Sequence, residues 1–142
     1  NLGWGMEDYL GRAAYEKQSA KIAIKEKRFD DAWRHLSNQK DCYLRHASQM
    51  GFSVVDALVL DSSPHEDMAN ILRLEGRHLE ALQHISYTYA TNFKAKRPLT
   101  TLEKKLSTYH KRADINSTFS AFLNNLKKAQ SADFVSIRDL VK

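Results

Sequence analysis

The interior of this chain is almost free of residues that interrupt helices. Its 142 residues include two prolines and five glycines, and three of those glycines fall within the first eleven positions. Apolar side chains recur every three or four residues almost throughout, which is the period of an amphipathic α-helix. The sequence therefore predicts an all-α fold.

The first part of this pattern divides into three expected helices. One is expected over about residues 5–27, and a second carries apolar residues from Trp33 to Met50 and ends at Gly51. The run from Val54 to Leu60 fits a buried strand or a buried helix. Because helices are expected on both sides and no partner strand is in view, we interpret it as a short helix.

The second part is punctuated by residues that favour helix starts. Serine, threonine and aspartate accept hydrogen bonds from the free N–H groups of a first turn. The expected caps are Ser63 with Glu66, Thr100 with Glu103, Asp114, and Ser131, with further helices running to Gly76, from Leu79 to Phe93, from Thr100 to Tyr109, from Ile115 to Leu126 and from Phe134 to Val141. The total is an array or bundle of about eight helices. Short linkers favour antiparallel neighbours.

Composition bounds the class of protein. A chain of 142 residues fits one domain, expected over residues 1–142, and its opening at Asn1 indicates a piece of a longer protein. The single cysteine, Cys42, excludes an internal disulfide, and no leader or long apolar span appears. We expect a cytoplasmic protein without a membrane partner. Its oligomeric state is left open.

One spacing of small and aromatic residues occurs twice. The first copy is Ala20, Ala23, Lys27, Phe29 and Ala32, and the second is Ala69, Leu72, Gly76, His78 and Ala81. Each copy describes two helices packed closely at their turn, and the pair resembles the helical hairpins of tetratricopeptide repeats over about half the chain. Close packing at a turn also occurs in other compact helical bundles.

The resemblance implies a function, because tetratricopeptide domains bind peptides in a groove formed by the first helix of each pair. Carried over by spacing, the exposed positions are Lys17, Lys21, Glu66, Asn70 and Arg73, and the four donors among them are Lys17, Lys21, Asn70 and Arg73. These donors would favour an acidic segment or a terminal carboxylate of a partner protein. The alternative interpretation is a solvated helix face.

A cluster of positive charge is the other organised feature. The chain has a net charge of +5. Between residues 94 and 112 Glu103 is the only acidic residue, whereas the basic residues are Lys94, Lys96, Arg97, Lys104, Lys105, Lys111 and Arg112. Such a segment attracts RNA or DNA phosphates. Because Tyr109 is its only aromatic residue, base stacking has little support, and a solubilising surface is the plain alternative.

An enzymatic alternative rests on Arg73 and His78. Their spacing resembles that of HEPN ribonucleases, which implies that the histidine acts as acid or base and the arginine stabilises phosphate charge. Gly76 is expected to break the helix between them. Cys42 and His46 lie four residues apart on one helix, but a metal site needs further ligands. No specific catalytic motif is present, and we expect no metal and no cofactor.

Overall fold

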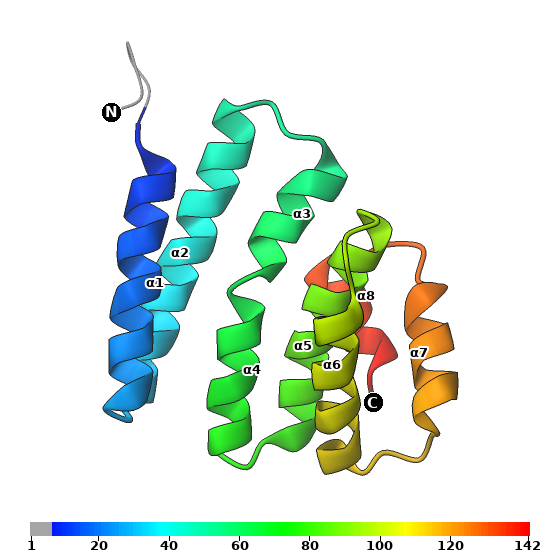
Figure 1. Cartoon of the computed structure of the whole chain (residues 1–142). Coiled ribbons are helices and arrows are strands. Elements are labelled where there is room, and N and C mark those ends of the chain that lie inside the picture. Colours follow the sequence, from blue (N-terminus) through cyan, green and yellow to red (C-terminus); the bar gives the residue numbers. More distant parts are fainter. Residues whose placement is uncertain (1–6) are drawn as a thin grey trace. The chain divides into compact units, whose positions relative to one another are not determined.

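The computed structural model describes residues 7–142 as α-helices joined by short turns, with no β-strand among them. This confirms the all-α prediction. The chain divides into two compact units, residues 1–64 and residues 65–142. Figure 1 shows the helices of each unit in sequence colours.

The first unit contains α1 (Tyr9–Lys25), α2 (Phe29–Gln49) and α3 (Val54–Ser62). Helices α1 and α2 pack side by side, and α3 packs against α2. Alanines line the α1–α2 interface, and Ala13, Ala20, Ala23 and Ala32 are fully buried. Small side chains allow two helices to approach closely, so this hairpin is held by tight backbone packing.

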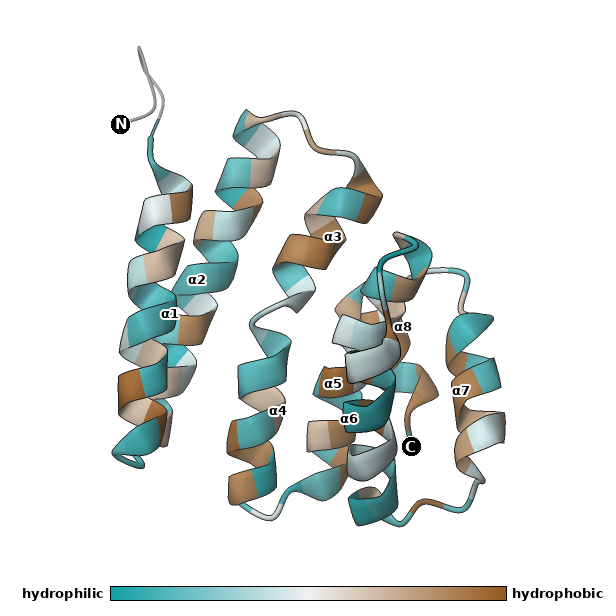
Figure 2. Cartoon of the chain, viewed as in Figure 1, coloured by the Kyte–Doolittle hydropathy of each residue, from teal (hydrophilic) through white to brown (hydrophobic). Residues whose placement is uncertain are grey.

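The second unit contains α4 (His65–Leu74), α5 (His78–Lys94), α6 (Thr100–Ala113), α7 (Phe119–Lys127) and α8 (Phe134–Leu140). Helix α5 is central, because it contacts each of the other four. Large residues fill its buried faces, among them Leu82, Ile85, Tyr87 and Tyr89. Figure 2 shows that the α5–α6 turn is mostly hydrophilic.

The same turn follows four of the helices. Lys27, Gly51, Gly76 and Lys96 each adopt a positive φ just after α1, α2, α4 and α5. The next residue then donates its N–H back into the helix, as Arg28 does to the Ala23 carbonyl and Arg77 to the Leu72 carbonyl, both at 2.8 Å. This is the Schellman geometry, which satisfies carbonyls that the helix end leaves free.

The predicted helix starts were less accurate than the helices themselves. The Ser63 hydroxyl donates to the Leu60 carbonyl at 2.9 Å and therefore closes α3, so the expected capping box with Glu66 does not form. Thr100 is the first residue of α6 and not its cap, because the Leu99 carbonyl already accepts the Glu103 N–H at 2.7 Å. Both predictions were wrong by about one residue.

The last two caps were also wrong. Asp114 ends α6 in the left-handed conformation, with φ of 52°, and the cap of α7 is Thr118. Asp133 caps α8 by accepting the Ser136 N–H at 2.9 Å, and the predicted cap Ser131 hydrogen-bonds to that carboxylate instead. A charged oxygen is the stronger acceptor, which explains why the aspartate takes the capping position.

Other expectations have mixed outcomes. The ambiguous run from Val54 to Leu60 is helical, as interpreted. Residues 5 and 6, where the first helix was expected to begin, lie outside the described residues. Residues 7–142 form eight helices, and only Ser63 and Pro64 lie between α3 and α4. The tetratricopeptide arrangement stays a prediction.

Candidate interaction surface

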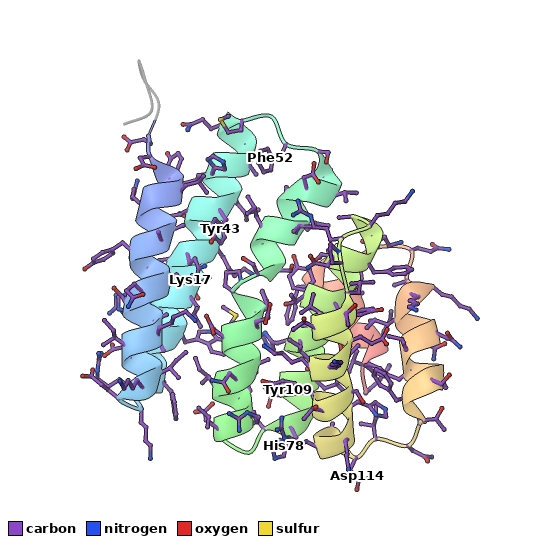
Figure 3. The ribbon with its side chains drawn as sticks, in the orientation of Figure 1. Lys17, Tyr43, Phe52, His78, Tyr109 and Asp114 are labelled. Carbon is purple, nitrogen blue, oxygen red and sulfur yellow. The ribbon has the colours of Figure 1, made fainter. Side chains whose placement is uncertain are left out.

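The four residues predicted to form a peptide groove lie on two helices in two units. Lys17 and Lys21 are exposed on α1, where Figure 3 labels Lys17. Asn70 and Arg73 are half-buried on α4, and the Arg73 guanidinium donates to the Asn70 side-chain oxygen at 2.7 Å and 3.2 Å. Each pair belongs to its own unit. The groove that would join them stays a prediction.

Arg73 and His78 lie in different helices, as the position of Gly76 predicted. Arg73 is in the last turn of α4, Gly76 has a φ of +76°, and His78 is the first residue of α5. The buried Nδ1 atom of His78 has no hydrogen-bond partner among the described residues. A histidine that acts as base needs a group to orient it, and the described residues supply none at this nitrogen.

The seven cations between residues 94 and 112 are all exposed and belong to the second unit. We call them the basic surface: Lys94, Lys96, Arg97, Lys104, Lys105, Lys111 and Arg112. Four of them lie on α6 as two pairs separated by seven residues, which is two helical turns, so they share one face. The buried Leu106, Tyr109 and His110 occupy the other face of α6.

Local contacts hold three of these cations in place. The Lys105 ammonium is 2.9 Å from the Glu66 carboxylate on α4, and this hydrogen bond raises the pKa of Lys105. Lys94 donates to the Gln130 carbonyl at 3.4 Å. The Arg112 guanidinium lies 5.4 Å from the centre of the Tyr109 ring. The Lys105 charge is therefore compensated by a carboxylate, whereas Lys94 and Arg112 are oriented by uncharged groups.

The net charge of the chain belongs entirely to the second unit. Residues 1–64 contain nine basic and nine acidic residues, whereas residues 65–142 contain thirteen basic and eight acidic residues. The segment 94–112 alone carries seven basic residues against Glu103. The sequence identified the charged segment, but the division into a neutral unit and a positive unit needed the structure.

Tyr109 is not available as a stacking platform. It is 6% exposed, and its ring is covered by the core on one side and by Arg112. Because base stacking needs an accessible aromatic face, this tyrosine gives the basic surface no means of holding nucleobases. The basic surface therefore presents positive charge without an exposed aromatic ring.

A second candidate surface is an open pocket of about 660 Å³ between α1 and α2. Four carboxylates line it against a single guanidinium: Glu7, Asp8, Glu16, Asp41 and Arg12. Buried Cys42 forms part of its wall, and burial raises the pKa of this thiol. A thiol that resists deprotonation is a poor nucleophile, so the pocket offers no cysteine chemistry.

Sequence reasoning missed two matched polar pairs. Glu16 on α1 contacts His35 on α2, and His65 on α4 contacts His84 on α5. Within each pair the residues are 19 positions apart, and the second pair lies 49 positions after the first, like Ala69 after Ala20. That shared offset was visible in the sequence and could have identified both pairs.

The remaining findings concern metal sites, membrane-spanning helices and similarity to known proteins. Among residues 7–142, no group of three or more histidine, cysteine, aspartate or glutamate residues is placed to hold a metal ion. Every helix in this range is too short or too polar to cross a bilayer. No family model, curated protein or solved structure matches this chain.

Proposed function

We propose that this chain is a protein-interaction module and that its basic surface binds an acidic segment of a partner protein. The supporting observation is the concentration of charge: seven exposed cations of one unit lie between residues 94 and 112, against one acidic residue. Lys105 is committed to Glu66, which leaves six cations to meet a partner. This imbalance is the observation that supports the proposal.

Rigidity of α6 supports the proposal. Leu106 is fully buried, and Tyr109 and His110 are nearly so, which fixes the helix against the core. The cations therefore project from a surface that needs little ordering when a partner binds. Charge-assisted hydrogen bonds from Lys104, Lys111 and Arg112 to carboxylates would supply affinity and make binding sensitive to salt.

The resemblance to tetratricopeptide hairpins supports a finer version of the proposal. In that version an acidic peptide binds in a groove formed by Lys17, Lys21, Asn70 and Arg73. Alanine substitutions of Lys17, Lys21 and Arg73 should then weaken binding of an acidic peptide by at least tenfold. If they leave the affinity unchanged while basic-surface variants reduce it, the partner binds at α6 and the groove is excluded.

Nucleic acid is the second candidate, favoured by the same excess of cations over acids. Its phosphates would release counterions from the basic surface, so affinity would fall steeply with salt. The burial of Tyr109 favours the acidic protein instead. The HEPN-like ribonuclease version predicts in addition that His78→Ala abolishes RNA cleavage while helicity is retained, and unchanged cleavage would exclude it.

Fluorescence anisotropy with two labelled probes tests the proposal. The probes are a 12-residue glutamate- and aspartate-rich peptide and a 12-nucleotide single-stranded RNA. The test variant combines Lys104→Gln, Lys111→Gln and Arg112→Gln. The matched control combines Lys25→Gln, Lys27→Gln and Arg34→Gln, which removes the same charge from exposed positions of the neutral unit.

We expect the test variant to bind the peptide at least tenfold more weakly than the parent, because three charge-assisted contacts are lost. The control should bind the peptide almost as the parent does. Equal loss in both variants would show that overall charge, and not this surface, attracts the peptide. Binding of the RNA without binding of the peptide would replace the proposal with the nucleic-acid alternative.

A further inference from the structure

The two helical hairpins, α1–α2 and α4–α5, carry different titratable side chains at equivalent positions. In the first, the Glu16 carboxylate is 2.7 Å from Nδ1 of His35. In the second, Nδ1 of His65 is 2.9 Å from Nδ1 of His84. Each pair joins the two helices of its hairpin, so each contributes to holding that hairpin closed.

The two pairs differ in the groups that face each other, a carboxylate and an imidazole in the first and two imidazoles in the second. A carboxylate beside an imidazole is stabilised when the imidazole gains a proton. Two imidazoles share a hydrogen bond only when one nitrogen donates and the other accepts, so at least one ring has to keep a free lone pair. The His65–His84 pair can therefore take up one extra proton, but a second one leaves two cations in contact with no acceptor between them.

The histidine pair lies under the last helix of the chain. His65 is 2% exposed, and its ring stacks on that of His84 with 5.0 Å between centroids. The centroid of the Phe134 ring of α8 lies 4.9 Å from the His65 ring centroid and 4.8 Å from that of His84. Tyr87 completes the cluster at 4.7 Å from His65. Separation of the two imidazoles would therefore disturb the site that α8 occupies.

The charged groups near the pair determine where the first proton goes. Helix α5 supplies Glu80, whose pKa is lowered chiefly by the hydrogen bond from Arg77 and in smaller part by His84. The interaction is mutual, so Glu80 favours a proton on His84. The other charged side chains of the helices that contact the pair are Glu66, Asp67 and Arg73 of α4, Lys94 of α5, and Arg138 and Asp139 of α8, with Asp133 at the start of α8.

We propose that the His65–His84 pair is an acid-sensitive latch that holds α8 on the second unit at neutral pH and releases it in acid. Below the ordinary titration range of histidine, near pH 6.5, a freed pair binds two protons whereas the closed pair binds at most one. The state that binds more protons gains with acid, so the open state becomes tenfold more populated for each pH unit.

The attachment of α8 suits such a release. Besides Phe134, it depends on the buried side chains of Ile137 and Val141 and on the Gln83 side chain, which donates to the Val141 carbonyl at 2.9 Å. The helix spans seven residues near the described C-terminal end. A short terminal element held by few contacts opens locally without unfolding the rest of its unit.

Hydrogen exchange measured by NMR tests the latch. Protection factors of the amides in residues 134–141, corrected for intrinsic exchange, are compared at pH 7.5 and pH 5.0. We expect at least a tenfold loss of protection at pH 5.0, with the α1 and α2 amides unchanged. Equal protection at both pH values in the parent protein would overturn the proposal by itself.

Two variants separate the latch from general acid sensitivity. His65→Glu installs the glutamate–histidine chemistry of the first hairpin, and it should remove the loss of α8 protection at pH 5.0. His84→Gln keeps a neutral donor for the His65 nitrogen and should do the same. If both variants fold and retain the full pH dependence of the parent, the histidine pair is not the sensor.

Discussion

The two units differ most in what they bury. In the first, the buried apolar residues are almost all alanines, and Leu36 is the one large aliphatic side chain buried among residues 7–64. In the second, Leu72, Leu82, Ile85, Tyr87 and Tyr89 are all at most 1% exposed. Hydrophobic stabilisation scales with the apolar area removed from water. Alanines let the helices of the first unit pack closely but bury little apolar area. We therefore expect the second unit to gain more hydrophobic stabilisation than the first.

The surfaces of the two units differ in the opposite way, because the first unit exposes more of the large hydrophobic residues. Eight of the twelve large hydrophobic residues that are exposed among the described residues belong to the first unit, including Phe52, which Figure 3 labels. That unit has no net charge, whereas the second carries all of the net positive charge. We infer that the first unit opens more easily and that the second is the more stable unit.

Truncation of the core should give the largest effect. Ile85→Ala removes a fully buried side chain from α5 and should lower the free energy of unfolding of the second unit by about 2–5 kcal/mol. Native-state hydrogen exchange of the α5 amides measures this change. Leu79→Ala, on the same helix but 39% exposed, is the control and should change the value by about 0.5 kcal/mol or less.

The same experiment can break the comparison. Leu36→Ala, 49 positions earlier in the chain, should reduce the protection of α2 amides and leave the α5 amides unchanged. If Ile85→Ala lowers the protection of α2 amides as much as that of α5 amides, the two units unfold together. The difference in their cores would then not translate into a difference in stability.

Exchanging the residues at two equivalent turns should give a smaller effect. Lys27 and Gly76 adopt the same left-handed conformation, with φ of 60° and 76°. Lys27→Gly should stabilise the first unit and Gly76→Lys destabilise the second, each by about 0.5–1 kcal/mol, because only glycine tolerates this backbone without strain. A Cβ atom added at Gly76 meets no atom within 4 Å, so the cost comes from the backbone conformation and not from a clash at Cβ.

Chemical denaturation monitored by circular dichroism measures both changes. Lys25→Gly is the control, since Lys25 lies in the last turn of α1 and glycine weakens a regular helix. Lys25→Gly should lower the stability of the first unit, whereas Lys27→Gly should raise it. A loss of stability in both variants would show that the turn does not demand glycine-like freedom.

The cap of α8 should give the smallest effect, and one that depends on pH. The hydrogen bond from Ser131, together with those from Ser136, lowers the pKa of Asp133 to about 2. A carboxyl group whose folded pKa is depressed stabilises the fold above its unfolded pKa and loses that contribution as the pH falls through about 2. Asp133→Ala should therefore cost about 1 kcal/mol at pH 7 and almost nothing at pH 2.

An uncharged cap in the first unit provides the comparison. The Ser53 hydroxyl accepts the Asp56 N–H at 3.2 Å at the start of α3. Ser53→Ala should also destabilise its helix, but by an amount that does not change between pH 7 and pH 2. Denaturant unfolding of both variants across this pH range measures the contrast, and a pH-independent cost for Asp133→Ala would contradict the role of its carboxylate.

The helix caps and turn residues that were not predicted correctly from the sequence have a common cause. Ser131 and Asp133 are both good caps, and so are Asp114 and Thr118, so local rules identify the region of a helix start but not the residue. Lys27 and Lys96 adopt the conformation that glycine marks at Gly51 and Gly76, and no local signal marks the lysines. Patterns of residue type therefore do not choose between neighbouring candidates.

The features of the candidate sites also divide into those that the sequence predicted and those that needed the structure. The positive charge of residues 94–112 was evident from composition, whereas the neutralisation of Lys105 by Glu66 joins residues 39 positions apart. The histidine pair is separated by 19 positions and is covered by Phe134, a further 50 residues along the chain. Neither arrangement can be inferred until the neighbouring helices are known.

The sequence by itself determined that this chain is helical, because helical periodicity and the scarcity of breakers act over a few residues at a time. It also determined where the charge lies. Only the tertiary structure decided that this charge belongs to one of two units, which cations are already paired, and that two histidines share a partly buried hydrogen bond. Those features depend on which helices become neighbours, and contacts between residues distant in the chain select the neighbours.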